Sequence, residues 1–274
     1  MKGFAITLVT ISLIMILVML ASSLHDGRLS MERIFSEPQT LISGSFIIKS
    51  ISHDVNSICG PNITITQLNN SVSILFVDII PNNGPTALSA YEDFIETTLA
   101  NKTHSIIDAN FSDINSSTIQ LTINGDYFYI RDYNNSDLLF TADGQTSANA
   151  YYINISVSRT RESITSFTYD DDGDLNVTLR YMDNNGTESS DGKVFSSGIT
   201  RFSALYDDGS YIYVDIGLKN GNDGSLWIKS YNCTAIASWV VELPAIEYNN
   251  ELGYTYNASI YYEHGNTLIS RQIG

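Results

Sequence analysis

The most concentrated set of potential metal ligands in this chain is the run from Asp170 to Asn176. Oxygen-bearing side chains alternate there at Asp170, Asp172, Asp174 and Asn176 around a glycine, as they do at the start of a calcium-binding loop. However, the glycine follows the second acid of the series rather than the third, and no glutamate stands where such a loop needs its bidentate ligand. An acidic turn between two strands explains the same residues, so we expect no metal site and keep calcium as the secondary interpretation.

Residues that could carry catalysis occur without a recognisable motif. The sequence has no nucleophile elbow, zinc-protease pair, phosphate-binding loop or dinucleotide glycine pattern. Its four histidines, His25, His53, His104 and His264, are isolated from one another. Carboxylate pairs of the kind that glycosidases use arise readily in an acidic chain, and none here has a recognisable context. We therefore expect no enzyme, no catalytic residue and no cofactor, with an exported carbohydrate-active enzyme as the least favoured class.

The Asn-x-Ser/Thr signal for N-glycosylation occurs eleven times, always after residue 60. The candidate sites are Asn62, Asn69, Asn101, Asn110, Asn115, Asn134, Asn154, Asn176, Asn185, Asn232 and Asn257. Their number agrees with an exported body that has a hydrophilic, sugar-coated surface. A composition rich in Asn and Ser is the alternative explanation.

Two cysteines, Cys59 and Cys233, are too few for a disulfide framework and lack the spacing of metal ligands. In an exported protein they can form one bridge, which would close a long loop and stabilise the fold by roughly 4–5 kcal/mol in the entropic treatment. Two separate buried thiols are the alternative.

Aromatic residues in the expected strands are candidates for a platform that binds sugars or partner proteins. They are Trp227, Trp239, Tyr211, Tyr213, Tyr231, Tyr261 and Tyr262. Because side chains alternate between the two faces of a strand, about half of these rings should point into the core.

The N-terminal segment is the strongest topological signal. Residues 4–21 contain no charge, and as a helix they would extend about 27 Å, just enough to cross the hydrocarbon core of a membrane. Lys2 and the amino terminus precede this run, whereas the excess negative charge follows residue 60, which favours the amino terminus inside and the body outside. Three outcomes stay open: cleavage after Ser23 and secretion, an uncut anchor, or cleavage within the triplet Lys2-Gly3-Phe4.

That triplet, placed directly before the apolar run, resembles the class III signal peptide of archaeal type IV pilin-like proteins. The resemblance covers about the first thirty-five residues and the plan of one helix followed by a β-rich head. It implies cleavage after Gly3, a mature chain starting at Phe4, and a helix that first anchors the subunit and then packs in a filament core. Leu8 stands at the fifth mature position, where many pilins have glutamate.

The net charge of −16 excludes one class of partner. Residues 1–60 are neutral overall, so the entire excess of negative charge lies in residues 61–274. A body this acidic repels phosphate backbones, so we expect no nucleic-acid binding.

Periodicity predicts the elements that position these residues. Residues 36–60 favour an amphipathic helix whose apolar stripe (Leu41, Ile48, Ile51, Val55 and Ile58) either lies under the head or pairs with the same helix of a neighbour. A second helix is expected at Thr86–Ala100. The expected strands are Asn62–Leu68, Ser71–Ile80, Ser117–Ile123, Asp126–Arg131, Tyr151–Ser158, Ser163–Tyr169, Leu175–Met182, Tyr211–Leu218, Ser225–Tyr231, Thr234–Leu243 and Tyr254–Glu263, with Ser71–Ile80 and Thr234–Leu243 apolar enough to be central.

Turn dipeptides between these strands predict antiparallel sheets joined by hairpins, most simply a β-sandwich head. They are Asn124-Gly125, Asp172-Gly173, Asn185-Gly186, Asp208-Gly209 and Asn220-Gly221. We expect a leader and transmembrane or assembly helix at 1–35, the amphipathic helix at 36–60, an α+β unit at 61–144 and an all-β unit at 145–274. Residues 141–149 form the seam between the last two, or a loop within one domain.

The sequence thus predicts a mainly β, non-enzymatic surface protein carried by an N-terminal pilin-like helix. Its expected partners are the membrane and other pilin-like subunits, in a homo- or hetero-oligomer such as a type IV pilus-type filament. The alternative is a membrane-anchored binding or adhesion module that does not polymerise, with carbohydrate as one candidate ligand.

Overall fold

A computed structural model describes residues 41–58, 60–67, 71–80, 84–115, 118–133, 135–143, 148–244, 252–256, 258–264 and 267–273. The expected leader, with Lys2, Gly3 and Phe4, and the apolar segment that follows it lie outside the described residues. So do Cys59 and the glycosylation candidates Asn69, Asn134 and Asn257.

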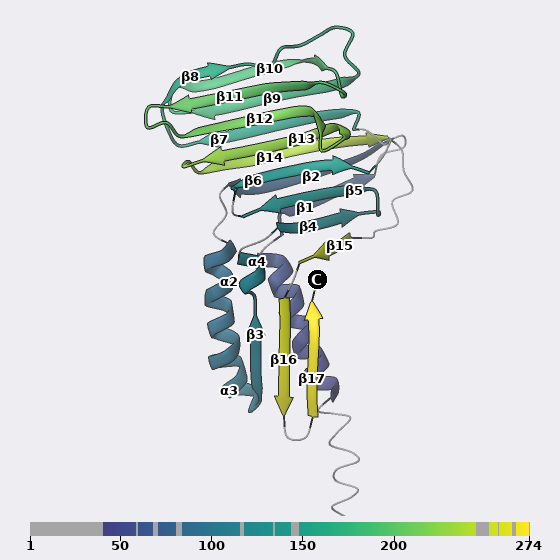
Figure 1. Cartoon of the computed structure of the whole chain (residues 1–274), viewed down its shortest axis with the longest axis vertical. Helices are drawn as coiled ribbons and strands as arrows, with labels where there is room; N and C mark the ends of the chain where they lie inside the picture. The colour runs from purple at the N-terminus through teal and green to yellow at the C-terminus, as the bar shows by residue number, and fades with distance from the viewer. Residues whose placement is uncertain are drawn as a thin grey trace, which may run out of the picture.

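The protein is mainly β, and its larger part is a sandwich of two sheets (Figure 1). The six-stranded sheet has the order β1 (Asn62–Gln67), β2 (Ser71–Ile80), β14 (Ala235–Pro244), β7 (Ala150–Val157), β9 (Leu175–Asp183) and β10 (Gly186–Val194). The eight-stranded sheet has the order β15 (Leu252–Thr255), β4 (Thr118–Ile123), β5 (Tyr127–Asp132), β6 (Asp137–Ala142), β13 (Asn222–Tyr231), β12 (Tyr211–Lys219), β11 (Ile199–Tyr206) and β8 (Arg161–Thr165). These pairings are antiparallel except for β7 and β9, which run parallel because β8 crosses to the other sheet between them.

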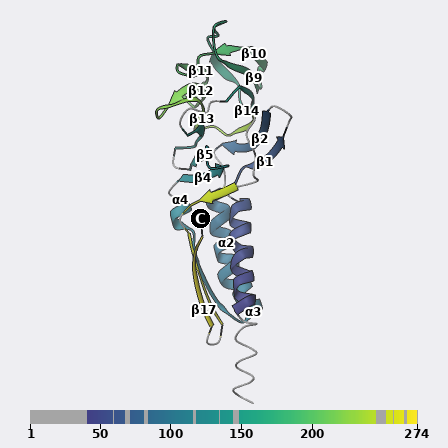
Figure 2. The ribbon, with the colours of Figure 1, turned by 90° about the vertical axis from the view of Figure 1, so that its right-hand side faces the viewer.

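A smaller α+β unit, here called the base, lies at one end of the long axis (Figures 1 and 2). Its sheet has the order β17 (Thr267–Ile273), β16 (Ala258–His264) and β3 (Ile106–Asn110), all antiparallel. Helical residues 41–58, here called the N-terminal helix, pack in the base together with one continuous helical stretch and a short helix. The stretch comprises α2 (Gly84–Asp93), the π-helical turn η1 (Phe94–Leu99) and α3 (Ala100–Thr103), and the short helix is α4 (Ser112–Asn115).

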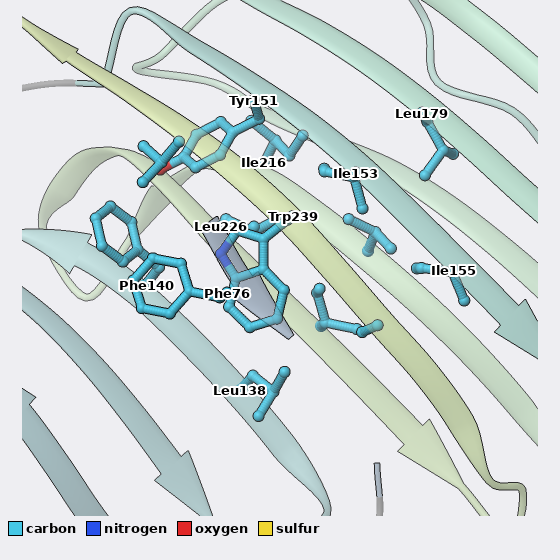
Figure 3. Close-up of a cluster of buried hydrophobic side chains, with 14 of the residues drawn as sticks. Phe76, Leu138, Phe140, Tyr151, Ile153, Ile155, Leu179, Ile216, Leu226 and Trp239 are labelled. Atoms are coloured by element: carbon cyan, nitrogen blue, oxygen red, sulfur yellow. The ribbon is translucent and has the colours of Figure 1, made fainter. Parts of the chain in front are cut away.

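The core of the sandwich is aromatic at its centre. Phe76 on β2 stacks on Trp239 of β14, with ring centroids 5.1 Å apart, and on Tyr129 of β5 at 5.5 Å. Figure 3 shows Phe76 and Trp239 pointing between the sheets together with Phe140 and Tyr151. Since β2 and β14 each have strands on both sides, the predicted central positions of Ser71–Ile80 and Thr234–Leu243 are confirmed.

A buried ion pair ties the two sandwich sheets together near the base. The guanidinium of Arg131 on β5 pairs with the carboxylate of Asp78 on β2 and donates a second hydrogen bond to the carbonyl of Ile79. The hydroxyl of Tyr129 also donates to Asp78, and the guanidinium lies 5.1 Å from the ring of Tyr133, which packs against the base core. Both charged groups are almost fully buried, so each is stabilised by its protein partners rather than by water.

The predicted antiparallel hairpins are confirmed at four of the five turn dipeptides. At Asn124-Gly125 and Asn220-Gly221 both residues have positive φ, which is the backbone of a tight hairpin turn. The fifth prediction, Asp172-Gly173, is wrong as a hairpin. These residues join β8 in one sheet to β9 in the other, so the turn is part of a crossover.

The two hydrophobic cores do not follow the expected division at residues 144 and 145. Strands β4 to β6 share a sheet and a core with β12 and β13, so residues 118–142 belong with the second half of the sandwich. The base, in turn, collects the N-terminal helix, residues 84–115 and the last two strands. The chain therefore enters each unit more than once, and the described residues 141–143, 148 and 149 lie within the sandwich rather than at a seam.

Candidate functional site

The N-terminal helix has one face that packs in the base. Ile48, Ile51 and Val55 are fully buried there, and Ile58 is half-buried, as the three- and four-residue spacing predicts. Gly44 lies so close to the sheet that a Cβ atom would be 2.7 Å from side-chain atoms of Tyr262 and Ile269. The interpretation of the stripe as core is therefore confirmed for these positions, whereas Leu41 is half exposed and lies outside the contact.

Two polar contacts set the position of this helix along the base. The hydroxyl of Tyr91 on α2 donates to Asp54 over 2.5 Å, and burial together with that carboxylate raises the pKa of Tyr91 well above its ordinary value. The hydroxyl of Tyr256 donates to Asn56 over 2.7 Å. Because Tyr256 precedes β16 and Tyr262 lies near its end, residue 56 is close to the sandwich and residue 44 is at the far end of the base.

The far end of the base exposes apolar side chains. Leu41, Ile42 and Phe46 on the helix are 51%, 69% and 75% exposed, and Ile106 and Leu268 are 60% and 61% exposed. Ile106 is the first residue of β3, and Leu268 is the second residue of β17 (Figure 1). Both pair with Glu263 of β16, one on each side of it in the sheet. These five residues, here called the apolar foot, include four of the five most exposed large apolar side chains among the described residues. Such a concentration is typical of a surface that contacts a membrane or another protein.

The foot includes residues 41 and 42, where the described chain begins, and the apolar run at residues 4–21 precedes it in the sequence. Sequence reasoning identified the helix but missed Phe46, Ile106 and Leu268 as members of one surface. Phe46 follows Ile42 by four residues, so helical spacing alone places both side chains on one face. The two strand residues were not, because the strands that carry them had not been predicted.

The predicted aromatic candidates divide between the core and two surfaces. Trp239 is buried in the sandwich and Tyr262 in the base, and Tyr261 lies on the outer face of the base sheet. The other four meet on the outer face of the eight-stranded sheet, where Tyr211 stacks on Tyr231 at 5.2 Å and on Tyr213 at 5.7 Å. Trp227 meets Tyr213 edge-on at 5.2 Å.

The four oxygen ligands of the acidic run do not converge in the structure. Asp174 accepts hydrogen bonds from the backbone N–H and the hydroxyl of Ser196, at 2.7 and 2.6 Å. Burial acts to raise its pKa, but these two hydrogen bonds outweigh burial, and the pKa is lowered. Asp170 accepts from the N–H of Asp172, and Asn176 is exposed on β9. Within the described part of the chain, no three acidic, histidine or cysteine side chains form a metal-binding group.

Cys233 is a free thiol in the structure, and its bridge to Cys59 stays a prediction. It is buried between β13 and β14, with its sulfur 3.1 Å from the hydroxyl of Ser230 and 3.4 Å from the carbonyl of Tyr211. Burial raises the pKa of this thiol, which disfavours the reactive thiolate. Cys59 lies outside the described residues.

The glycosylation candidates whose side-chain exposure is described are all exposed. They are Asn62, Asn101, Asn110, Asn154, Asn176, Asn185 and Asn232. Those within sandwich strands, Asn62, Asn154 and Asn176, belong to β1, β7 and β9 of the six-stranded sheet. Asn115 is in α4.

Comparison with known proteins gives no match, so a function can be proposed only from the surfaces described above. No protein-family profile, no curated protein and no solved structure matches the chain. No helix within the described ranges is both long and apolar enough to cross a membrane.

Proposed function

We propose that this chain is a non-enzymatic extracytoplasmic surface protein, a pilin-like subunit or minor component of a type IV pilus-type filament. Its N-terminal helix carries the assembly surface, and the β-sandwich is presented away from it. The observation that carries the proposal is the apolar foot, which includes residues 41 and 42, where the described chain begins and from which the sequence runs back to the apolar segment at residues 4–21.

The arrangement of the base supports this role. A helix that is buried on one side and exposes Ile42 and Phe46 on the other can contact its own base and a neighbouring subunit at once. The sandwich closes its core without this helix, so assembly at the foot need not disturb the sandwich. The triplet Lys2-Gly3-Phe4 supplies a processing signal that would leave the apolar segment on the mature protein.

The second candidate function is an anchored binding module that does not polymerise. The aromatic cluster around Tyr211 favours it, because half-buried Tyr and Trp rings on a sheet surface are suited to ligand contact. Shearing of cells separates the two functions, since a filament subunit is released in particles that sediment and a single anchored module stays with the membrane.

The assembly surface is tested by replacing Phe46 with serine in the native host. We expect Phe46→Ser to reduce the amount of the protein in the sheared filament fraction at least severalfold, because the change removes an exposed ring from the foot. Phe195→Ser is the matched control, since Phe195 is 44% exposed but lies in the sandwich, after β10.

Both variants should reach wild-type levels in the membrane fraction, which separates assembly from folding. Equal loss of filament signal in both variants, or wild-type assembly of Phe46→Ser, would argue against the foot as the assembly surface.

A further inference from the structure

The outer face of the eight-stranded sheet carries an ordered group of aromatic and charged side chains. Strand register places Tyr231 opposite Tyr211, and Lys229 opposite Tyr213. It also places Trp227 opposite Asp215. All these residues point away from the core because the buried residues alternate with them. Their arrangement therefore follows from the pairing of β12 and β13 and does not depend on a loop.

Positively charged groups lie over two of the rings. The guanidinium of Arg201 on β11 lies 4.4 Å from the centre of the Tyr213 ring, and the ammonium of Lys219 lies 3.0 Å from that of Trp227. Arg201 also makes a bidentate pair with Asp215 at 2.6 and 2.7 Å. These contacts hold donors and acceptors in fixed positions around the rings.

A small pocket opens beside this cluster. Its volume is about 140 Å³, and its walls include Trp227, Arg201, Asp215 and Lys219, with Ile199 at the rim. This is smaller than the pockets of about 300 Å³ and above that hold drug-sized ligands, so it suits a single small ring. The walls offer an aromatic ring, hydrogen-bond donors and a carboxylate acceptor within one cavity.

The charges of the cluster nearly cancel. Arg201, Lys219 and Lys229 stand against Asp215 and Asp137, on a chain whose net charge is −16. A polyanion would be repelled by the body at a distance and would find Arg201 already paired with Asp215. A neutral ligand that both donates and accepts hydrogen bonds meets no such penalty.

The glycosylation candidates lie outside the strands of this face, and the nearest in sequence is Asn232, directly after Tyr231. No Asn-x-Ser/Thr site lies within the described strands of the eight-stranded sheet, whereas three lie within the six-stranded sheet. Sugars attached to Asn154 or Asn176 would cover the opposite side of the sandwich. The aromatic face thus stays open to a large ligand even if every one of those strand sites is modified.

We propose that this face is a binding site for an uncharged carbohydrate chain. A pyranose ring has a face rich in C–H groups, which packs on an exposed aromatic ring, and hydroxyls at its rim, which match Arg201 and Asp215. Tyr231, 49% exposed, provides the ring at one end of the cluster, and the pocket beside Trp227 receives a sugar unit at the other. A protein partner fits less well, because the cores of protein interfaces are depleted of charge and here charged groups lie over two of the four rings. The site does not depend on whether the chain polymerises.

The test is affinity electrophoresis of the full chain, in detergent, through native gels that contain one soluble polysaccharide each. A glucan, a mannan and a galactan serve as neutral probes, and polygalacturonate as the charged comparison. At least one neutral polymer should retard the wild-type protein, and Tyr231→Ala should weaken that interaction by roughly tenfold. Tyr152→Ala is the matched control, because Tyr152 is 41% exposed on the six-stranded sheet. Tyr231→Phe keeps the ring and should bind nearly as the wild type does.

Circular dichroism of each variant confirms that folding is unchanged. The proposal is overturned if no neutral polymer retards the protein, if only polygalacturonate does, or if Tyr152→Ala weakens binding as much as Tyr231→Ala. A change in the sedimentation of the free protein on Tyr231→Ala, without any effect of polysaccharide, would assign the face to a protein partner instead.

Discussion

Replacement of either Arg131 or Asp78 should lower the stability of the fold strongly, because the remaining partner is then charged and buried without a counter-ion. We expect Arg131→Met to lower the free energy of unfolding by about 3–5 kcal/mol. Urea denaturation measures the change. Arg159→Met is the control, since the pair between Arg159 and Asp208 is exposed to solvent and should contribute little to stability. Similar losses in the two variants would show that burial of the Arg131 pair is not what matters.

Asp208 gives a prediction about pH. Hydrogen bonds from the hydroxyl and N–H of Ser210, followed by the contact with Arg159, lower the pKa of Asp208 to about 2. The unfolded chain binds this proton at higher pH than the folded chain, so the contribution to stability is present above about pH 4 and is lost as pH falls towards 2. Asp208→Asn should therefore reduce the acid dependence of the unfolding midpoint between pH 4 and pH 2. An unchanged slope in that range would contradict the assignment.

At this scale the sequence identified residue types but not their neighbours. The rings of Tyr211, Tyr213 and Trp227 were candidates for a platform, but alternation predicted only that about half of the candidate rings face the core, without saying that Trp239 is one of them. Arg201 was not identified, because its contact with the Tyr213 ring depends on the pairing of β11 with β12, and β11 itself had not been predicted.

The N-terminal helix is the element on which the base depends, and Gly44 tests its contact with the sheet. Gly44→Leu must displace the buried ring of Tyr262, and overpacking of this kind costs about 1–3 kcal/mol. Gly253→Leu is the matched control, because a Cβ at Gly253 meets nothing within 4 Å. Hydrogen exchange should show faster exchange in β16 and β17 for Gly44→Leu, with the sandwich strands unchanged. Wild-type protection of those strands would mean that the helix does not bind there as described.

Twelve of the described strands overlap a predicted one, and five were missed: β3, β6, β10, β11 and β17, although buried residues alternate along β6 and part of β11. Each of the eleven expected strands overlaps a strand in the structure, although the last divides into β15 and β16. The strand β10 (GTESSDGKV) was missed because it is an edge strand with polar residues on both faces. The edge strands β3 and β17 are held by β16 and the N-terminal helix, so tertiary contacts rather than local pattern determine them. The expected helix at Thr86–Ala100 was confirmed, with a π-helical turn that no pattern indicated.

For the whole molecule, the sequence predicted an antiparallel, mainly β body but not how the chain is shared between two units. Sequence composition predicts a domain boundary at the point where the composition changes along the chain. In the structure, however, the last two strands pack beside the N-terminal helix. This packing is a long-range contact, visible in Figure 2 as β17 beside the purple helix, and it leaves no local signal in the sequence.

Glycosylation makes a prediction at the same scale. If the body is exported, the native protein should be heavier than its 30.3 kDa chain, and peptides that contain Asn154 and Asn176 should carry sugar. Mass spectrometry of peptides before and after enzymatic removal of N-glycans measures this. Unmodified Asn at every exposed candidate site would contradict the predicted sugar coat and remove one argument for the open aromatic face.

The central claim is that the apolar N-terminal segment is kept on the mature protein as its anchor and assembly surface. The most direct test is the N-terminal residue of the native protein, read by intact mass or sequencing. The account predicts a chain that begins at Phe4, and a Gly3 substitution that blocks this processing. A native chain that begins at Leu24 would contradict it, because the apolar segment at residues 4–21 would then have been removed.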